Sequence, residues 1–443
     1  MASEINIPAV KLCVDGELTE GGISISDGKI VRIGKESTLP RSDTTIQGRG
    51  LLALPGLVDV HVHLRDLELS YKEDYFSGTS AAAAGGFTSL IDMPNTRPVT
   101  DTAERLTQKM EVAKRKIVVK VGFNIVPSNL AEVEKSVDLA MGYKVNLVKP
   151  WSNLPVDKSS LASLIRRATS IGKMVIFHAE DGAMVGKLED RFRESTSLRS
   201  YYAAHPSKAE DIAVARVLDC IVEEAAKVHF CHISSLRSLR LIKTARDQGK
   251  RVTCEATPHH MYLSKESSSK LGGISIMDPP LRRREVATKL FYGLKRRAID
   301  IVATDHAPHL LEEKKQFPWW KIPIGIPGLE TALPLMLTEV KKGNIALGRV
   351  IEAMAEAPAK IFGLNGGALK EGGPADIVLV DLKRSFKIDS SLFFSKAKYS
   401  PFDGRRVIGK VAKTFVGGRL VFDEDRIVAA AGTGAILSPG TAG

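Results

Sequence analysis

Cysteine is scarce in this chain and is not arranged as a structural framework. Four of the 443 residues are cysteines, at positions 13, 220, 231 and 254, and none of them forms a Cys-x-x-Cys pair. Three lie in apolar surroundings, as Cys231 does after Val228-His229-Phe230. This usage does not indicate a disulfide scaffold. It is typical of buried thiols in a reducing compartment.

Long apolar segments are also absent. No apolar run approaches the roughly 18 residues that a membrane span needs. The first residues show no charged start followed by an apolar stretch, so the sequence does not predict a signal peptide. We therefore expect a cytoplasmic protein that makes no membrane contact.

The net charge of +12 is not concentrated in a recognisable binding motif. Basic residues occur in short, scattered runs, such as residues 114–116 and 282–284. No RNA-binding motif and no basic strip interleaved with aromatic residues is present, so we expect no nucleic-acid partner. The favoured interpretation is a solvated basic surface that also attracts anionic substrates.

Short apolar segments of strand length recur through the middle of the chain and alternate with helical segments. The eight candidate strands are residues 57–61, 88–93, 120–125, 143–148, 174–178, 228–232, 252–256 and 299–304. Eight strand-then-helix units within about 250 residues predict an α/β fold, a TIM-like (β/α)8 barrel.

Strand-like segments also occur at both ends of the chain. We expect residues 1–53 and 365–430 to form one small β-sandwich domain beside a barrel of residues 54–364. Residues 431–443 are rich in Ala, Gly, Ser and Pro, and this composition predicts a loose tail.

The most informative segment follows the first barrel strand. His61 and His63 are two residues apart at its end, so their side chains should project from the same face. Two neutral imidazoles on one face can hold a divalent metal ion. Taken alone, the pair could also be two hydrogen-bonded structural histidines.

Polar side chains follow several other strands, at the end of a barrel where active sites lie. They include Asn95 after strand two, Lys144 and Lys149 at strand four, His178 at strand five, His232 at strand six, and Asp305 and His309 at strand eight. Four strands that contribute His or Asp to one rim are difficult to explain as structural coincidence. The sequence therefore predicts a metal site on this rim.

The motifs resemble those of the type I dihydroorotases, within the amidohydrolase superfamily. The resemblance covers nearly the whole chain and rests on residues 61–66 (HVHLRD), 71–74 (YKED), 93–96 (MPNT), 278–282 (DPPLR), 303–309 (ATDHAPH), 325–331 (GIPGLET) and 400–404 (SPFDG). The first of these and the ATDHAPH segment are the most specific. The chain departs from the usual pattern at Asp278, where relatives usually have Asn. It also departs at Asp66-Leu67-Glu68-Leu69, which replaces the Pro-Gly that relatives often have after the HLR motif.

This resemblance implies two zinc ions per chain. His61, His63 and Asp305 would hold the first, His178 and His232 the second, and a carboxylated lysine would bridge them. Lys144 resembles the modified lysine of relatives, and its position within a strand favours burial, where a lysine amine loses its proton more readily. Lys149, just before Pro150, is the alternative.

The resemblance also implies how a substrate is bound and hydrolysed. Arg65, Asn95 and His309 would bind the carboxylate of dihydroorotate or N-carbamoyl-L-aspartate, since a guanidinium fork matches a carboxylate. Asp305 would move a proton from the attacking water to the ring nitrogen. The reaction would be the reversible opening of dihydroorotate in de novo pyrimidine (UMP) biosynthesis.

Two other functions remain open at this point. Hydantoinases, dihydropyrimidinases and allantoinases act on rings without this carboxylate, which the pairing of Arg65 with Asn95 does not favour. A non-catalytic relative would be expected to have lost metal ligands, and here the ligands are present. The sequence leaves open whether the chain forms a homodimer or associates with aspartate transcarbamoylase.

Overall fold

The computed structural model describes residues 3–14 and 17–440. Its larger part is a closed barrel of parallel strands, as the sequence predicts. The barrel strands are β6 Leu57–Val62, β7 Phe87–Asp92, β8 Lys120–Phe123, β9 Tyr143–Asn146, β10 Met174–His178, β11 Lys227–Phe230, β12 Arg251–Ala256 and β13 Ile301–Val302. Two single bridges, Val62 with His306 and Ile125 with Tyr143, join the two parts of the sheet and close the barrel.

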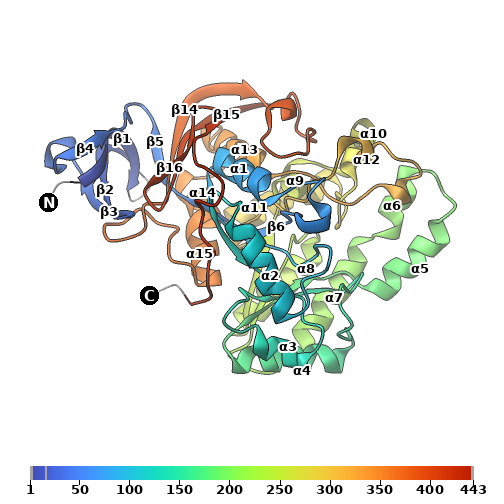
Figure 1. Cartoon of the computed structure of the whole chain (residues 1–443). Helices are drawn as coiled ribbons and strands as arrows, with labels where there is room; N and C mark the ends of the chain where they lie inside the picture. Colours follow the sequence, from blue (N-terminus) through green and yellow to red (C-terminus); the bar gives the residue numbers. More distant parts are fainter. Residues whose placement is uncertain (1–2, 15–16, 441–443) are drawn as a thin grey trace.

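Helices surround these strands (Figure 1). They are α1 Tyr75–Gly85, α2 Ala103–Lys114, α3 Leu130–Lys135, α4 Lys158–Ser170, α5 Gly182–Phe192, α6 Leu198–Ala204, α7 Ser207–Asp219, α8 Leu236–Asp247, α9 Pro258–Tyr262, α10 Ser268–Leu271, α11 Arg284–Lys295, α12 Leu311–Lys314, α13 Leu329–Lys341, α14 Leu347–Ile351 and α15 Ala357–Phe362. Side-chain caps fix several of their starts. Asp74 accepts from Ser77 N at the start of α1, and Asp181 accepts from Met184 N at the start of α5.

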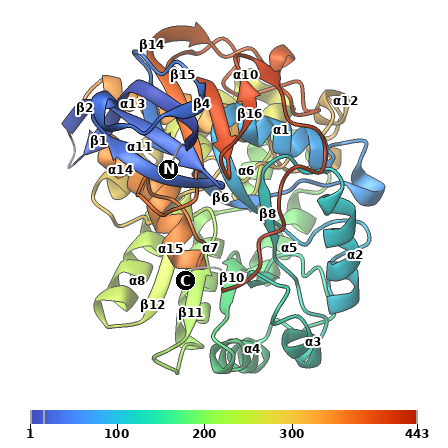
Figure 2. The same cartoon turned by 60° about the vertical axis from the view of Figure 1, so that its left-hand side comes forward.

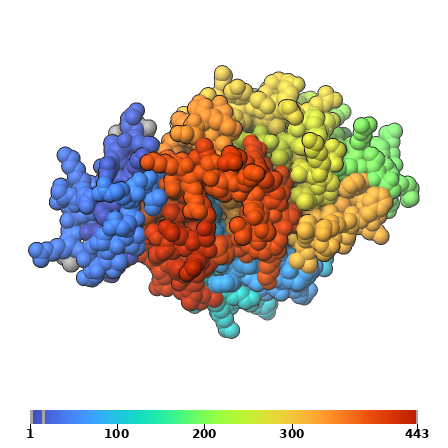
Figure 3. Space-filling model, turned by 90° about the horizontal axis from the view of Figure 1, so that it is seen from above, coloured from blue at the N-terminus to red at the C-terminus, as the bar shows by residue number. Residues whose placement is uncertain are grey.

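The two ends of the chain meet in a second, mostly antiparallel sheet. Within the described residues it has nine strands: β1 Ser3–Val14, β2 Glu17–Ser26, β3 Lys29–Gly34, β4 Ser42–Thr45, β5 Leu52–Pro55, β14 Ile377–Lys387, β15 Arg406–Val416, β16 Arg419–Asp423 and β17 Arg426–Ile427. Strand β5 pairs with both β1 and β14, which joins the N-terminal and C-terminal strands. In Figure 2 the blue N-terminal strands lie beside the red C-terminal ones, and in the space-filling view of Figure 3 the blue and red segments lie side by side.

Apolar side chains from both ends of the chain pack together in one buried cluster of this sheet. Ile7, Ile23, Ile377 and Phe415 are fully buried in one cluster there. Strand β5 ends at Pro55 and β6 begins at Leu57, so the terminal sheet leads directly into the first barrel strand.

The segment expected to be a loose tail, residues 431–443, is bound to the barrel over most of its described length. Gly432 N and Gly434 N donate to Ile117 O, and Leu437 N donates to Val121 O. Ile436 forms a parallel bridge with Val121 on β8. Composition predicted disorder, but the edge of β8 offers unpaired backbone groups that this segment satisfies. Residues 441–443 lie outside the described residues.

Among the described residues, no helix is both long and apolar enough to span a membrane.

Candidate metal centre and substrate cleft

A cleft of about 280 Å³ lies at the carboxyl ends of the barrel strands. It is lined by every residue that the sequence singles out: His61, His63, Arg65, Asn95, Lys144, Lys149, His178, His232, Asp305 and His309. The parallel barrel brings these side chains together because all its strands end at the same rim. Their placement agrees with the predicted site, and their individual roles remain predictions.

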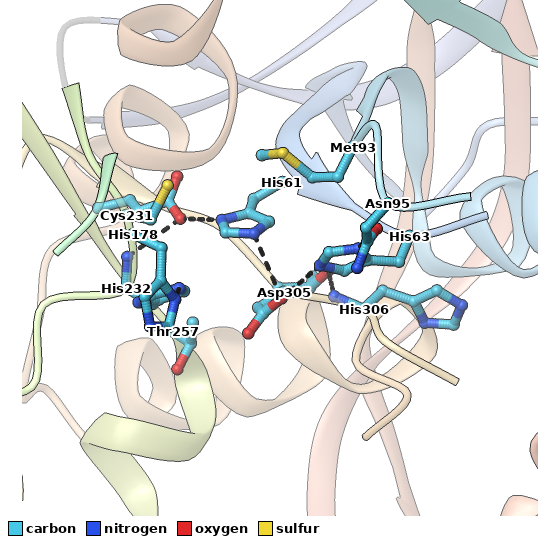
Figure 4. A network of polar contacts seen from close by, with 12 residues as sticks. His61, His63, Met93, Asn95, His178, Cys231, His232, Thr257, Asp305 and His306 are labelled. Carbon is cyan, nitrogen blue, oxygen red and sulfur yellow. Dashed lines mark hydrogen bonds and ion pairs between the residues drawn. The ribbon is translucent and has the colours of Figure 1, made fainter. Parts of the chain in front are cut away.

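Three electron-pair donors converge at one point of this cleft. His61 Nε2 lies 3.4 Å from Asp305 Oδ1, and His63 Nε2 lies 3.2 Å from the same oxygen. All three side chains are buried, and their candidate ligand atoms lie within 4.8 Å of one another. Figure 4 shows His61, His63 and Asp305 turned toward a common point. Two imidazoles and one carboxylate suit a divalent metal ion such as zinc.

A carboxylate behind His61 fixes the orientation of its ring. Glu255 contacts His61 Nδ1, so the other ring nitrogen, Nε2, faces the cleft. Burial disfavours charge on this imidazole, but the Glu255 carboxylate outweighs it and raises the pKa of His61 to about 10. A metal ion would therefore displace a proton from Nε2 while Nδ1 keeps its contact with Glu255.

His63 is held from the side opposite to its candidate ligand atom. Its Nδ1 donates to Asn95 Oδ1 at 2.6 Å, which leaves the lone pair of Nε2 directed at Asp305. Burial first, and then the charge of Arg65, lowers the pKa of His63 to about 4. The ring is therefore neutral at physiological pH, as a metal ligand must be.

A second pair of histidines lies on the other side of His61. His178 Nε2 donates to Glu180 at 3.0 Å, so its Nδ1 is the nitrogen available to a metal ion. That Nδ1 lies 3.0 Å from His232 Nε2. Burial first, then the charge of His178, holds the pKa of His232 well below its usual range. Two nitrogens at this separation can share one tetrahedral ion.

The two candidate lysines are in different environments. Lys144 is buried, with 1% of its surface exposed, and its Nζ lies 2.7 Å from Cys231 Sγ. The side chain of Lys149 is 60% exposed and forms an ion pair with Glu189 at 3.3 Å. Of the two, Lys144 is therefore the buried one, and its charge acts on both His61 and His232. Cys231 Sγ also belongs to a possible ligand group with His61 and His232.

Two hydrogen-bond donors meet at the other end of the cleft. Arg65 Nε donates to Pro308 O, and its Nη2 lies 3.1 Å from His309 Nε2. His309 Nε2 also lies 2.9 Å from Ile324 O, and its Nδ1 lies 3.0 Å from Lys72 Nζ. This end of the cleft is positively charged and suits an anionic group of a ligand.

Backbone strain is concentrated on this rim. Arg65, Asp66 and Leu67 are three successive residues with φ between 48° and 59°. His232 and Asp305 also have positive φ, at 29° and 47°. Residues with side chains rarely adopt this region, and such strain is characteristic of functional sites.

The wall that carries Asp278 contains groups that the sequence did not assign. Tyr201 OH donates to Asp278 Oδ1 at 2.5 Å, and His205 Nδ1 lies 3.5 Å from the same oxygen. Burial disfavours charge on His205, but Asp278 and Glu189 outweigh it and raise its pKa to about 9. Asp278 is thus a carboxylate paired with a buried imidazolium.

Sequence reasoning missed the residues that support the ligands. Glu255 lies inside β12 and belongs to none of the motifs from which the sequence predicts a site. Asp59 was also missed: its carboxylate accepts from Thr304 Oγ1 at 2.5 Å and from His61 N at 3.1 Å, and so joins the first barrel strand to the last. Both are acidic residues inside segments that the sequence predicts to be buried barrel strands, which is the signal that could have revealed them.

Comparison with known proteins agrees with this geometry. Residues 52–421 match the model of the amidohydrolase family. The chain belongs to the amidohydrolase family. It is 38% identical to a dihydroorotase of Bacillus cytotoxicus over 93% of this chain and 96% of that one, and 36% identical to a dihydroorotase of Bacillus cereus over the same shares.

Solved structures extend the likeness of this amidohydrolase. L-hydantoinase (dihydropyrimidinase) from Arthrobacter aurescens superposes with a TM-score of 0.93 at 30% identity, covering 98% of this chain and 100% of that one. Dihydropyrimidinase from Brevibacillus agri has a TM-score of 0.92 at 27% identity, covering 98% of each chain. As an amidohydrolase with dihydroorotases among its relatives, the chain is a cyclic amide hydrolase.

Proposed function

We propose that this amidohydrolase is a dihydroorotase. It would open the cyclic amide of dihydroorotate with water and, in the reverse direction, close N-carbamoyl-L-aspartate to dihydroorotate in de novo pyrimidine biosynthesis. The proposal extends the names of the relatives in sequence to this chain.

One observation carries the choice of substrate. Arg65 and His309 bring their N–H groups together at the end of the cleft that lies beyond the metal-ligand group. Dihydroorotate has a ring carboxylate that such donors would hold. Hydantoin and dihydrouracil have none, so they would leave the positively charged Arg65 side of the cleft without an anionic partner, which is unfavourable.

The residues present suit two zinc ions. We propose that His61, His63 and Asp305 hold one, that His178 and His232 hold the other, and that carboxylated Lys144 bridges them. When bound, the ions would supply Lewis acidity, which acidifies water and polarises the amide carbonyl. The burial of Lys144 supports its assignment over the exposed Lys149, because carbon dioxide reacts with a neutral amine.

The chain's own groups would bind the ring and move the proton. Arg65 and His309 would fix the ring carboxylate, and Asn95 would orient His63 while its amide group faces the cleft. Asp305 would accept the proton of the attacking water and deliver it to the departing ring nitrogen. Burial alone would raise the pKa of Asp305, but the positive charge of His61 and the contact with His63 hold it well below its usual range, so Asp305 is an ionised carboxylate with no proton of its own.

The structural likeness to hydantoinases makes those enzymes the alternative to be tested. Purified protein would be assayed for zinc per chain and for ring opening of dihydroorotate, hydantoin and dihydrouracil in the ultraviolet. About two zinc ions per chain and turnover of dihydroorotate alone are expected from the proposed ligand set. Turnover of hydantoin or dihydrouracil in preference to dihydroorotate would overturn the substrate assignment but not the family.

The assembly and location of the enzyme are further parts of the proposal. We propose a cytoplasmic enzyme, which the free, buried thiols of Cys220, Cys231 and Cys254 support. A homodimer and a complex with aspartate transcarbamoylase are the two assemblies to test, by sedimentation of the chain alone and of a mixture.

A further inference from the structure

A buried lysine, Lys72, lies behind the positively charged end of the cleft and has no role in the chemistry proposed above. Its side chain is 11% exposed, and its Nζ lies 2.8 Å from Glu313 Oε1. The same Nζ lies 3.0 Å from His309 Nδ1. Burial of an ammonium is costly, and Glu313 balances its charge. The contact with His309 is not needed for that balance.

The contacts of His309 determine which of its nitrogens carries the proton. An ammonium only donates, so His309 Nδ1 accepts from Lys72 and carries no hydrogen. A carbonyl oxygen only accepts, so His309 Nε2, at 2.9 Å from Ile324 O, carries the ring hydrogen. The two partners therefore specify one neutral tautomer from opposite sides of the ring.

With this tautomer, the contact between His309 and Arg65 is not a hydrogen bond. Arg65 Nη2 lies 3.1 Å from His309 Nε2, and both nitrogens carry hydrogens. Neither can accept from the other, and the His309 hydrogen is directed at Ile324 O. An anionic oxygen placed beside the two nitrogens could accept from Arg65 Nη2 and share the His309 hydrogen with Ile324 O.

We propose that Lys72 is a positioning residue. By donating to Nδ1 it keeps the hydrogen of His309 on Nε2, so that His309 and Arg65 together offer N–H groups to the substrate carboxylate. The inference rests on the proposed function, because the ring carboxylate of dihydroorotate is the group that would use these donors.

The charges around His309 show what the loss of Lys72 would do. Burial first, and then the charges of Arg65, Lys72 and Lys314, hold the pKa of His309 well below its usual range. Glu313 Oε2 lies 3.8 Å from Nδ1 and is the acidic group that faces it, while Tyr399 packs nearby from the C-terminal segment. Without Lys72, Nδ1 could take the hydrogen and donate to Glu313. Nε2 would then accept from Arg65 and compete with the substrate.

Two substitutions of Lys72 distinguish the loss of its hydrogen-bond donor from the loss of its charge. Lys72→Met removes both, and KM for dihydroorotate should rise about tenfold with kcat within about threefold of wild type. Lys72→Gln keeps a neutral N–H donor and should restore most of the lost affinity. Lys116→Met is the matched control. Lys116 forms an ion pair with Asp66, which lies in the same loop as Lys72, but Lys116 does not contact His309. The KM of Lys116→Met for dihydroorotate should therefore equal that of the wild type. The proposal would be overturned by equal increases of KM in Lys72→Met and Lys72→Gln, or by an unchanged KM in Lys72→Met.

A spectroscopic measurement tests the tautomer without using activity. In protein labelled with ¹⁵N-histidine, the signals of His309 would be identified by their loss in His309→Asn. We expect a neutral ring protonated on Nε2 in the wild type and in Lys72→Gln. A hydrogen on Nδ1 in the wild type would contradict the role of Lys72 even in an active enzyme. Conversely, an enzyme that does not open dihydroorotate but shows the expected tautomer would refute the substrate while the role of Lys72 in fixing His309 stands.

Discussion

Nδ1 of His61 contacts the Glu255 carboxylate, and this contact turns the opposite ring nitrogen toward Asp305. The same carboxylate accepts from His232 N at 3.1 Å and from His229 Nε2 at 3.0 Å. One buried glutamate therefore orients a candidate ligand of the first metal ion and fixes the backbone of a candidate ligand of the second.

Replacement of Glu255 by Gln should weaken metal binding before it affects the fold. An amide cannot stabilise the ring of His61 as a carboxylate does, so zinc affinity should fall about 10- to 100-fold. Competition with a chromophoric chelator would measure this fall. Glu223→Gln, which removes a surface ion pair with Arg166, is the control and should bind zinc as the wild type does. Unchanged affinity in Glu255→Gln would mean that Glu255 does not support the site.

Replacement of Asp305 by Asn should separate metal binding from proton transfer. The amide oxygen can still face His61 and His63, but it cannot accept and deliver a proton. We expect zinc content to remain largely unchanged and kcat to fall about a thousandfold. Metal analysis and steady-state rates on the same preparation test this expectation. A kcat near that of the wild type would remove Asp305 from the proton-transfer role.

The two lysines give opposite expectations for the bridging group. Lys144→Ala should lose zinc and activity, and added short carboxylates should restore part of the activity by replacing the carbamate. Lys149→Ala should keep its zinc, since it removes only an exposed ion pair with Glu189. The zinc content of both variants, with and without acetate or propionate, makes the comparison. The reverse pattern would assign the bridge to Lys149.

Arg65→Met tests the carboxylate end of the cleft. The substitution removes the guanidinium fork, so KM for dihydroorotate should rise by at least about tenfold while zinc content is retained. Steady-state kinetics with metal analysis measure both quantities. An unchanged KM would show that the carboxylate is held by other groups.

His205 should make stability depend on pH. Its pKa, about 9 in the folded chain, lies above its ordinary value of 6.5, so its charge stabilises the fold fully below pH 6.5. This contribution is lost as the pH rises through 9, and linkage puts it at about 3 kcal/mol. His205→Gln should therefore lower the urea midpoint at pH 6 and have little effect at pH 9.5. Equal destabilisation at both pH values would contradict a charged His205.

The clustering of the candidate ligands could be predicted because these residues follow a local rule. Alternate residues of a strand share a face, and parallel strands end at one rim, so His61, His63 and Asp305 could be placed together without a structure. Glu255 could not be placed in this way. It lies 194 residues from His61 along the chain, and only the closed barrel brings the two side chains together.

The complete fold also determines which side chains are buried and which strand edges are left unpaired. The sequence left Lys144 and Lys149 as alternatives, and the structure separates them because one lies inside the barrel and the other on its rim. The C-terminal segment has a composition typical of disorder. However, Ile436 pairs with Val121, because the barrel links the segment after β8 to β9 only through the Ile125–Tyr143 bridge and leaves Val121 free to pair, which composition does not reveal.

The most direct test of a dihydroorotase is the reverse reaction, since it uses the substrate that carries every group the cleft is proposed to bind. Zinc-loaded protein would be incubated with N-carbamoyl-L-aspartate, and ring closure followed in the ultraviolet. We predict formation of dihydroorotate by the wild type and its loss in Asp305→Asn. No ring closure by the zinc-loaded wild type, together with ready opening of hydantoin or dihydrouracil, would contradict the proposed function.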